Sequence, residues 1–322
     1  MSVNVYQIVT DQILEKLAQG TVPWHQPWRG GQRPTNLVSG KPYRGINVLL
    51  LGTAGYTSPY WMTYKQMVNL RGHLKPLPEF AAHYGEEWTD EDGVTHKAYA
   101  TGQKSTLVVF WQMIKARKDP ADDPKAKARM FPLLRNYRVF NLDQTEDIRV
   151  PQGRISDEPV AVIDPIEAAE VIIAAYPNPP KIVEAGDAAW YRASEDLVNL
   201  PPRKLFSESG EFYATAFHEL GHSTGHKSRL DRPDSAGNRF GDHKYGREEL
   251  VAEMTAAFLA AEAGIETVHD NNAAYLAGWI KNIREDVKAV VVAAGQAQKA
   301  ADYILGRTPA EDAEPEPQQA AA

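Results

Sequence analysis

Three residues within one short segment have the types and spacing that metal-assisted hydrolysis requires. His218, Glu219 and His222 form a His-Glu-x-x-His pattern. On a helix, residues four apart share a face, so the two imidazoles can offer nitrogens to one metal ion. Glu219 adjoins the first histidine, where its carboxylate can act as a general base toward water at the metal. The pattern therefore predicts a catalytic metal site with Glu219 as the base.

The residues around the pattern predict a helix, which the shared face requires. Ser207 or Ser209 can serve as N-cap, and Gly225 can end the helix. Phe217 and Leu220 supply apolar positions between these ends. The pattern fixes only three positions and can arise by chance in a long chain, but this context favours the metal site.

A third ligand is expected downstream, in residues 247–259, which are rich in helix-forming residues. Glu249 and Glu253 lie one turn apart there, an arrangement that resembles the gluzincins. The resemblance implies that Glu249 binds the metal and Glu253 orients a histidine from the outer shell, with the reverse assignment as the alternative. Glu248 is predicted to lie on a solvated acidic face, and His226 is interpreted as structural or outer-shell. Zinc is the predicted ion, with manganese or another divalent metal as the alternative.

Composition excludes several other kinds of chemistry. The chain has 322 residues, 43% hydrophobic and 24% charged, as in ordinary globular proteins. It contains no cysteine, which excludes disulfides, thiolate nucleophiles and cysteine-ligated zinc. No apolar run reaches membrane-spanning length, and the first 17 residues have the pattern of an amphipathic helix rather than a signal peptide. We therefore expect no membrane partner and a cytoplasmic location.

Charge and aromatic residues are distributed unevenly along the chain. Residues 1–150 hold 19 Lys and Arg against 14 Asp and Glu, a balance of +5, whereas residues 151–322 hold 16 against 28, a balance of −12. Five of the seven tryptophans also lie in the first half. A basic half rich in aromatic residues suggests contact with an anionic polymer that carries flat bases.

The order of patterns predicts an α+β fold with two domains, residues 1–150 and 151–308, followed by a disordered tail at 309–322. Helices are expected at 1–17, 46–51, 60–70 and 165–176, at the segment around Glu249, and over the helical spacing from 276 to 304. Strands are expected at 106–111 and 137–142. Three short strands at 182–186, 189–192 and 196–200 are expected to form a meander. The second or third of them is expected to line the substrate cleft by edge pairing.

Seven blocks, taken together, resemble the antirestriction proteins of the ArdC family, which conjugative plasmids carry. They are Val-Pro-Trp at 22–24, Asn36, Tyr-Arg-Gly-Ile-Asn at 43–47, Gly-Gln-Lys-Ser at 102–105, Tyr-Arg-Val-Phe-Asn at 137–141, His-Glu-x-x-His at 218–222 and Glu-Glu-Leu-Val-Ala-Glu at 248–253. The resemblance implies an N-terminal domain that binds single-stranded DNA and a C-terminal domain like a zinc metallopeptidase. It also implies that incoming plasmid DNA is protected from host restriction.

The residues themselves provide weaker support for DNA binding. Candidates for neutralising phosphates are Lys41, Arg44, Lys104, Arg135 and Arg138, and candidates for stacking on bases are Trp24, Trp28, Tyr43 and Trp111. Taken singly, a tryptophan is more often core and a lysine or arginine more often solvated surface. Taken together, the candidates of the first half favour nucleic acid.

Two other functions compete with DNA protection. The first is a cytosolic zinc metalloprotease that acts on a host protein, with the N-terminal half positioning that substrate. The second is a binding module whose metal is purely structural. Glu219 argues against the second, because a structural site does not need a general base beside its ligand. The charge and aromatic asymmetry favours DNA protection over the first.

Overall fold

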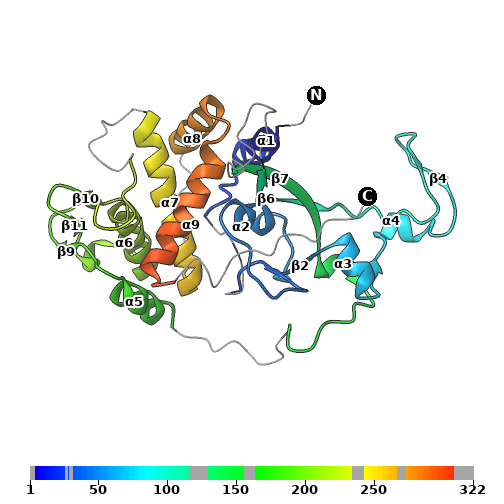
Figure 1. Cartoon of the computed structure of the whole chain (residues 1–322), viewed down its shortest axis with the longest axis horizontal. Coiled ribbons are helices and arrows are strands. Elements are labelled where there is room, and N and C mark those ends of the chain that lie inside the picture. Colours follow the sequence, from blue (N-terminus) through cyan, green and yellow to red (C-terminus); the bar gives the residue numbers. More distant parts are fainter. Residues whose placement is uncertain are drawn as a thin grey trace, which may run out of the picture.

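The computed structural model describes residues 4–25, 28, 32–115, 130–155, 164–233, 243–266 and 273–307. The predicted tail at 309–322 lies outside these residues. The fold is α+β and has two domains, an N-terminal one built around a sheet and a largely helical C-terminal one (Figure 1).

The N-terminal domain is organised around a four-stranded sheet of order β1-β2-β7-β6. Its strands are β1 (Thr35–Asn36), β2 (Tyr60–Thr63), β6 (Thr106–Lys115) and β7 (Met130–Asn141). β1 and β2 are parallel, and the other neighbours are antiparallel, with Thr106 opposite Val139 and Lys115 opposite Met130. The helices are α1 (Val5–Ala18), α2 (Ile46–Gly52), α3 (Tyr64–Asn69) and α4 (Pro78–Ala81).

Two small ribbons complete this domain. β3 (His73–Leu74) pairs with β8 (Thr145–Glu146), which follows the 3-10 helix Leu142–Gln144. β4 (Trp88–Thr89) pairs with β5 (Thr95–His96) in an arm that projects away from the sheet (Figure 1).

The helix expected over residues 60–70 is wrong for its first four residues. Residues 60–63 form β2, and the helix α3 begins only at Tyr64. The Thr63 side chain accepts a hydrogen bond from the backbone of Gln66, and the Gln66 side chain accepts one from the backbone of Thr63. This capping box sets the helix start at a residue that also ends a strand.

The C-terminal domain contains α5 (Pro165–Ala175), α6 (Ser209–Ser223), α7 (His243–Ala263), α8 (Ala273–Glu285) and α9 (Ala289–Ile304). Its strands are β9 (Lys181–Glu184), β10 (Trp190–Arg192) and β11 (Leu197–Leu200), and a 3-10 helix spans Arg203–Leu205. The strand order is β10-β11-β9, and β9 is parallel to β11, so the expected meander is wrong. The chain passes from β9 at one edge of the sheet to β10 at the other edge, and β11 then lies between them.

One continuous cluster of buried apolar side chains joins the two domains. It includes Val9 and Ile13 of α1 together with Phe258 of α7 and Val290 of α9. The α1 helix packs on α8 and α9, and α2 also contacts α9 (Figure 1). Each domain therefore covers apolar surface of the other, and they share one hydrophobic core. Within the described part of the chain, no helix has the length and apolar character needed to cross a membrane.

Candidate metal centre

The α6 helix carries the two histidines, and its start differs from expectation. Its N-cap is Glu208 rather than Ser207 or Ser209. The Glu211 carboxylate accepts hydrogen bonds from the backbone N–H groups of Ser207, at 3.1 Å, and Glu208, at 3.4 Å. An acidic side chain in the first turn also complements the positive end of the helix dipole. The helix ends at Ser223, two residues before the expected Gly225.

A close approach between α6 and α7 brings the acidic residues to the histidines. Gly221 lies between His218 and His222 on α6 and is buried. A Cβ atom at Gly221 would lie 3.2 Å from the Cα of Ala252 and 3.3 Å from its carbonyl oxygen, both backbone atoms of α7. The absence of a side chain at position 221 therefore lets the two helices pack close together.

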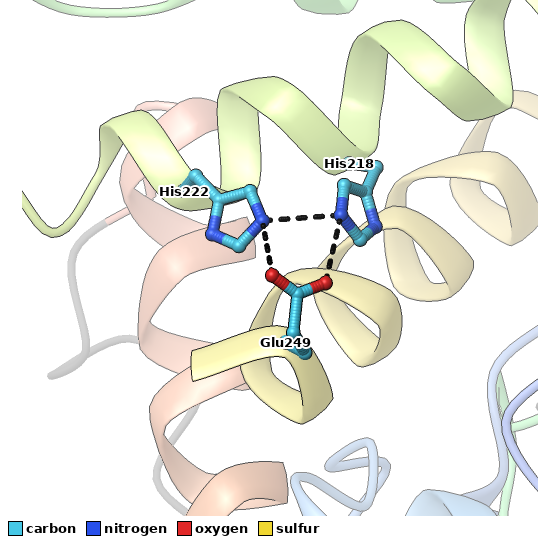
Figure 2. A group of neighbouring side chains, drawn as sticks. All are labelled: His218, His222 and Glu249. Carbon is cyan, nitrogen blue, oxygen red and sulfur yellow. Dashed lines mark hydrogen bonds and ion pairs between the residues drawn. The ribbon is translucent and has the colours of Figure 1, made fainter. Parts of the chain in front are cut away.

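His218, His222 and Glu249 converge on one point (Figure 2). The two Nε2 atoms lie 3.1 Å apart, and the Glu249 carboxylate oxygens lie 3.6 Å from Nε2 of His218 and 3.5 Å from Nε2 of His222. Ligand atoms about 2.0–2.1 Å from one tetrahedral zinc lie roughly 3.3 Å apart. The three separations therefore suit donors that share one ion.

Glu253 and Glu248 contact the other nitrogens of the two histidines. Glu253 Oε1 lies 3.7 Å from Nδ1 of His218, and Glu248 Oε1 lies 3.6 Å from Nδ1 of His222. In metal sites, partners of this kind fix the tautomer and orientation of a histidine ligand. Glu249 thus faces the Nε2 atoms of both histidines, whereas Glu253 faces only Nδ1 of His218.

Glu248 is not on a solvated face, and that expectation is wrong. Glu248 is only 7% exposed, and its carboxylate forms an ion pair with the buried Arg232. Burial raises the pKa of Glu248, but hydrogen bonds from His222 and Arg232 outweigh this effect and lower the pKa below its ordinary value. Sequence reasoning also missed Arg232, which donates to the carbonyl of Gly221 at 3.0 Å. His226 bonds to Ser228 at 2.8 Å and belongs to the loop after α6.

Electrostatics at the centre favour a bound cation. Four carboxylates, those of residues 219, 248, 249 and 253, surround two histidines. Burial opposes charge on His218, yet Glu249, Glu253 and Glu219 raise its pKa to about 9. Burial also raises the pKa of Glu219, although both histidines oppose that shift. Two imidazoles and a carboxylate are a donor set typical of catalytic zinc, so these residues fit a divalent ion.

The edge strand β10 lies beside α6, whereas β11 lies in the middle of its sheet. Of the two strands expected to line the substrate cleft, β10 is the one that lies at an edge of the described sheet, as pairing with a peptide requires. The backbone of Tyr191 in β10 lowers the pKa of Glu219 and so favours its charged form, against the larger effect of burial. The Tyr191 hydroxyl donates to Asp196 at 3.0 Å, and Nη1 and Nη2 of Arg229 donate to the two Asp196 carboxylate oxygens at 2.8 and 2.7 Å.

The aromatic candidates for DNA stacking are mostly buried, which corrects that expectation. Trp24 is 0% exposed and meets Trp279 edge-on at 5.9 Å, and Trp28 is 6% exposed and stacks on Phe258 at 6.2 Å. Tyr43 is 3% exposed. These rings belong to hydrophobic clusters and offer no face to a base. Trp111, by contrast, is 51% exposed.

The basic candidates divide into two groups. Lys41, Lys104, Arg135 and Arg138 are exposed. Arg44 instead forms an ion pair with Asp302 of α9, and only 16% of its side chain is exposed. The exposed cations stay candidates for phosphate contact, whereas Arg44 joins the two domains.

Comparison with known proteins agrees with this two-part architecture. The family described as the N-terminal domain of anti-restriction factor ArdC matches residues 3–140, and the family described as zincin-like metallopeptidase matches residues 167–296. Two curated DNA primases TraC of Escherichia coli are 35% and 33% identical to this chain and align with 93% of it. The chain spans only 27% and 20% of the length of those primases. An uncharacterized protein, y4eC of Sinorhizobium fredii (strain NBRC 101917 / NGR234), is 31% identical over 94% of this chain and 91% of its own.

Solved structures extend the match to the whole fold. The metal-free crystal structure of the antirestriction ArdC protein from plasmid R388 is 32% identical, with a TM-score of 0.68 over 94% of this chain and 97% of that one. The Mn(II)-bound structure of the same protein is 31% identical, with a TM-score of 0.67 over 94% and 98%. The two family models together cover most of the residues that the structure describes. The chain belongs to the ArdC family of antirestriction proteins.

Proposed function

We propose that the C-terminal domain is a metal-dependent peptidase in which His218, His222 and Glu249 hold one divalent ion. The proposal rests on the convergence of these three side chains, with the buried carboxylate of Glu219 next to His218 in the sequence. Zinc suits two imidazoles and a carboxylate, and the Mn(II) bound by the R388 protein makes manganese the main alternative. A divalent ion supplies Lewis acidity, which makes water easier to deprotonate and a peptide carbonyl easier to attack.

The side chains around the ion have separate tasks in this proposal. Glu219 accepts the proton of the attacking water and then delivers it to the leaving amine. Its raised pKa brings it closer to neutral pH, where proton transfer in both directions is easiest. The β10 edge holds an extended peptide by backbone hydrogen bonds, and the Tyr191 backbone of that strand lowers the pKa of Glu219.

The test of the base is the Glu219→Gln variant. We expect it to retain one equivalent of metal and to lose at least about a hundredfold in any peptide hydrolysis. His218→Ala is the matched control, since it should lose both the metal and the activity. Hydrolysis at the normal rate by metal-loaded Glu219→Gln would show that another group acts as the base.

We further propose that the protein binds single-stranded DNA and thereby protects incoming conjugative plasmid DNA from host restriction. Membership of the antirestriction family, the +5 balance of residues 1–150 and the exposed Lys41, Lys104 and Arg138 support this. Phosphate neutralisation releases counterions, so binding should weaken as salt rises. This function would place the protein in the cytoplasm of the recipient cell.

Coating of the DNA is the simplest route to protection, because a bound protein excludes an endonuclease sterically. A second route is cleavage of a host protein involved in restriction. The three metal donors His218, His222 and Glu249, together with the proposed base Glu219, support this route. A nuclease-protection assay separates the two routes if it compares the wild type with Glu219→Gln, both as full chains because the domains share one core. Equal protection supports coating. Protection that disappears in Glu219→Gln while DNA binding persists points to the metal centre.

A further inference from the structure

A groove of about 540 Å³ lies where the two domains meet. Its walls come from β6 and the segment 44–47 of the N-terminal domain and from α9 of the C-terminal domain, which lie side by side in Figure 1. Its volume falls within the roughly 300–1,000 Å³ of sites that hold small organic groups. The histidines and carboxylates of the metal centre do not line it.

The β6 wall presents an aromatic ring and backbone polar groups. Trp111 is 51% exposed and meets Tyr6 of α1 edge-on at 6.1 Å. β6 is the edge strand of its sheet. The Asn47 side chain bonds to both the N–H and the C=O of Val109, each at 2.8 Å, so these groups point away from β7. Trp111 lies two residues further along and therefore directs its own N–H and C=O to the same side.

The α9 wall is a helical stripe of Gly295, Lys299 and Tyr303, at intervals of four residues. Lys299 is exposed. A Cβ atom at Gly295 would meet nothing within 4 Å, so the groove is open at this point. The stripe thus combines a cation, an aromatic residue and free space, facing the tryptophan of the other domain.

The charges of the groove favour an anion. Arg44, Lys299 and Arg307 line it, and Arg33 shares the Glu262 carboxylate with Arg307. Arg44 pairs with Asp302. The groove lining therefore holds three cations, Arg44, Lys299 and Arg307, against one carboxylate, Asp302, a balance of +2, whereas Arg33 and Glu262 lie outside the lining.

We propose that this interdomain groove is a binding subsite for single-stranded DNA. One base of the strand stacks on Trp111, and Lys299 neutralises an adjacent phosphate. A π-face together with nearby cations is the chemistry by which proteins hold single strands without reading sequence. The inference rests on the proposed single-strand binding, and it assigns part of that function to α9 of the metallopeptidase domain.

The test uses the full chain and a fluorescein-labelled oligo(dT), with binding followed by anisotropy at low salt. We expect Trp111→Ala to lose roughly 5- to 150-fold in affinity, the equivalent of about 1–3 kcal/mol for one stacked base. Lys299→Glu should weaken binding and reduce the salt slope by about 0.7 or more. Gly295→Leu should block the groove without altering any ligand-binding side chain.

Matched controls separate the groove from general effects on charge or folding. Lys181→Glu on β9 and Tyr99→Ala, an exposed aromatic residue at 71%, should bind like the wild type. A single abasic site in the oligonucleotide should weaken the wild type more than Trp111→Ala, because only the wild type has a stack to lose. Thermal unfolding of each variant identifies any that fail to fold, and Gly295→Leu then tests the groove independently of Trp111.

Three outcomes of these binding measurements test the proposed subsite. Weaker binding by the groove variants, with unchanged controls, supports the subsite. Normal binding by Trp111→Ala, Lys299→Glu and Gly295→Leu rejects the groove but leaves the proposed single-strand binding intact. No binding by the wild type at low salt rejects both proposals together.

Discussion

Arg44 of the N-terminal domain forms a buried ion pair with Asp302 of α9 in the C-terminal domain. The neighbouring Gly45 N–H donates to the Gln298 side chain at 3.1 Å, and Gln298 donates to Asp302 at 3.0 Å. Gly45 adopts φ +55°, and a Cβ there would lie 3.6 Å from the carbonyl of Ala294, so the turn rests on α9. A single polar network therefore fastens the two domains together.

Removing the arginine should destabilise both domains at once. Asp302 is 2% exposed, and Arg44→Ala would leave its charge buried with only Gln298 as a partner. We expect a loss of about 3 kcal/mol, the lower end for a broken buried pair, because 16% of the Arg44 side chain is exposed. Denaturant unfolding followed by far-UV circular dichroism would measure it and should show a single transition.

The control for that experiment is Arg192→Ala. Arg192 and Glu195 are about half exposed and form a local pair, so its removal should cost less than about 0.5 kcal/mol. Two separate transitions in the wild type, or equal effects of both substitutions, would show that the network does not couple the domains.

The outer carboxylates should affect metal affinity less than the ligands do. Glu253→Gln and Glu248→Gln each remove a partner of a histidine Nδ1, which typically costs about 10- to 100-fold in metal affinity. Glu249→Gln should abolish stoichiometric binding. Competition titration against a metal chelator would measure all three, with the exposed Glu195→Gln as the control. A larger effect of Glu253→Gln than of Glu249→Gln would reverse the two assignments.

The sequence predicted the residues that converge at the candidate metal centre better than it predicted the residues around them. His218, Glu219 and His222 follow from a local spacing, and the Glu249–Glu253 pair is one turn of a recognisable helix. Arg232 and Glu248 could not be assigned in this way, because they lie sixteen positions apart and no local spacing links them. The only local signal was that Glu248 adjoins Glu249 and could face the same neighbour.

The buried tryptophans show a second limit of sequence reasoning. Five tryptophans in a basic half suggested base stacking, yet Trp24 and Trp28 pack against Trp279 and Phe258 of the other domain. Trp24 and Trp28 lie between α1 and β1, outside any described helix or strand, so no periodic pattern marked them as part of the shared core. Strand order failed for a related reason, since short strands of similar composition can be arranged in several ways.

Metal binding should strengthen as pH rises. Nearby carboxylates raise the pKa of His218 to about 9 in the metal-free protein, so at pH 7 a metal must displace a proton. We expect apparent affinity to increase about tenfold per pH unit below pH 9 and then to level off. Calorimetric titrations in buffers of different ionisation enthalpy would count the protons released.

The stability of the metal-free protein should change in the opposite direction. The pKa of His218 is raised above its unfolded value of about 6.5, so protonation stabilises the folded state. This contribution is fully present below pH 6.5 and is lost as pH rises through 9. Comparison of thermal unfolding at pH 6.5 and pH 9 between the wild type and His218→Gln would isolate it. The same pH trend in both proteins would contradict the assignment.

Two glycines in helices provide a matched test of the close packing at the metal centre. Gly221→Ala places a methyl group 3.2 Å from the Ala252 backbone, so α6 and α7 must separate. Gly295→Ala places the same group where nothing lies within 4 Å. Both changes favour the helix by up to about 1 kcal/mol, so the difference between them reports packing alone.

We expect Gly295→Ala to raise the free energy of unfolding by about 0.5–1 kcal/mol. Gly221→Ala should lower it by about 1–3 kcal/mol, the usual cost of overpacking. It should also weaken metal binding, because separation of the helices moves Glu249 away from His218 and His222. Denaturant unfolding and metal titration of both variants check the two effects together. A stable Gly221→Ala variant with normal metal affinity would show that the helices can move apart without disturbing the donors, and Gly221 would then not be required for the site.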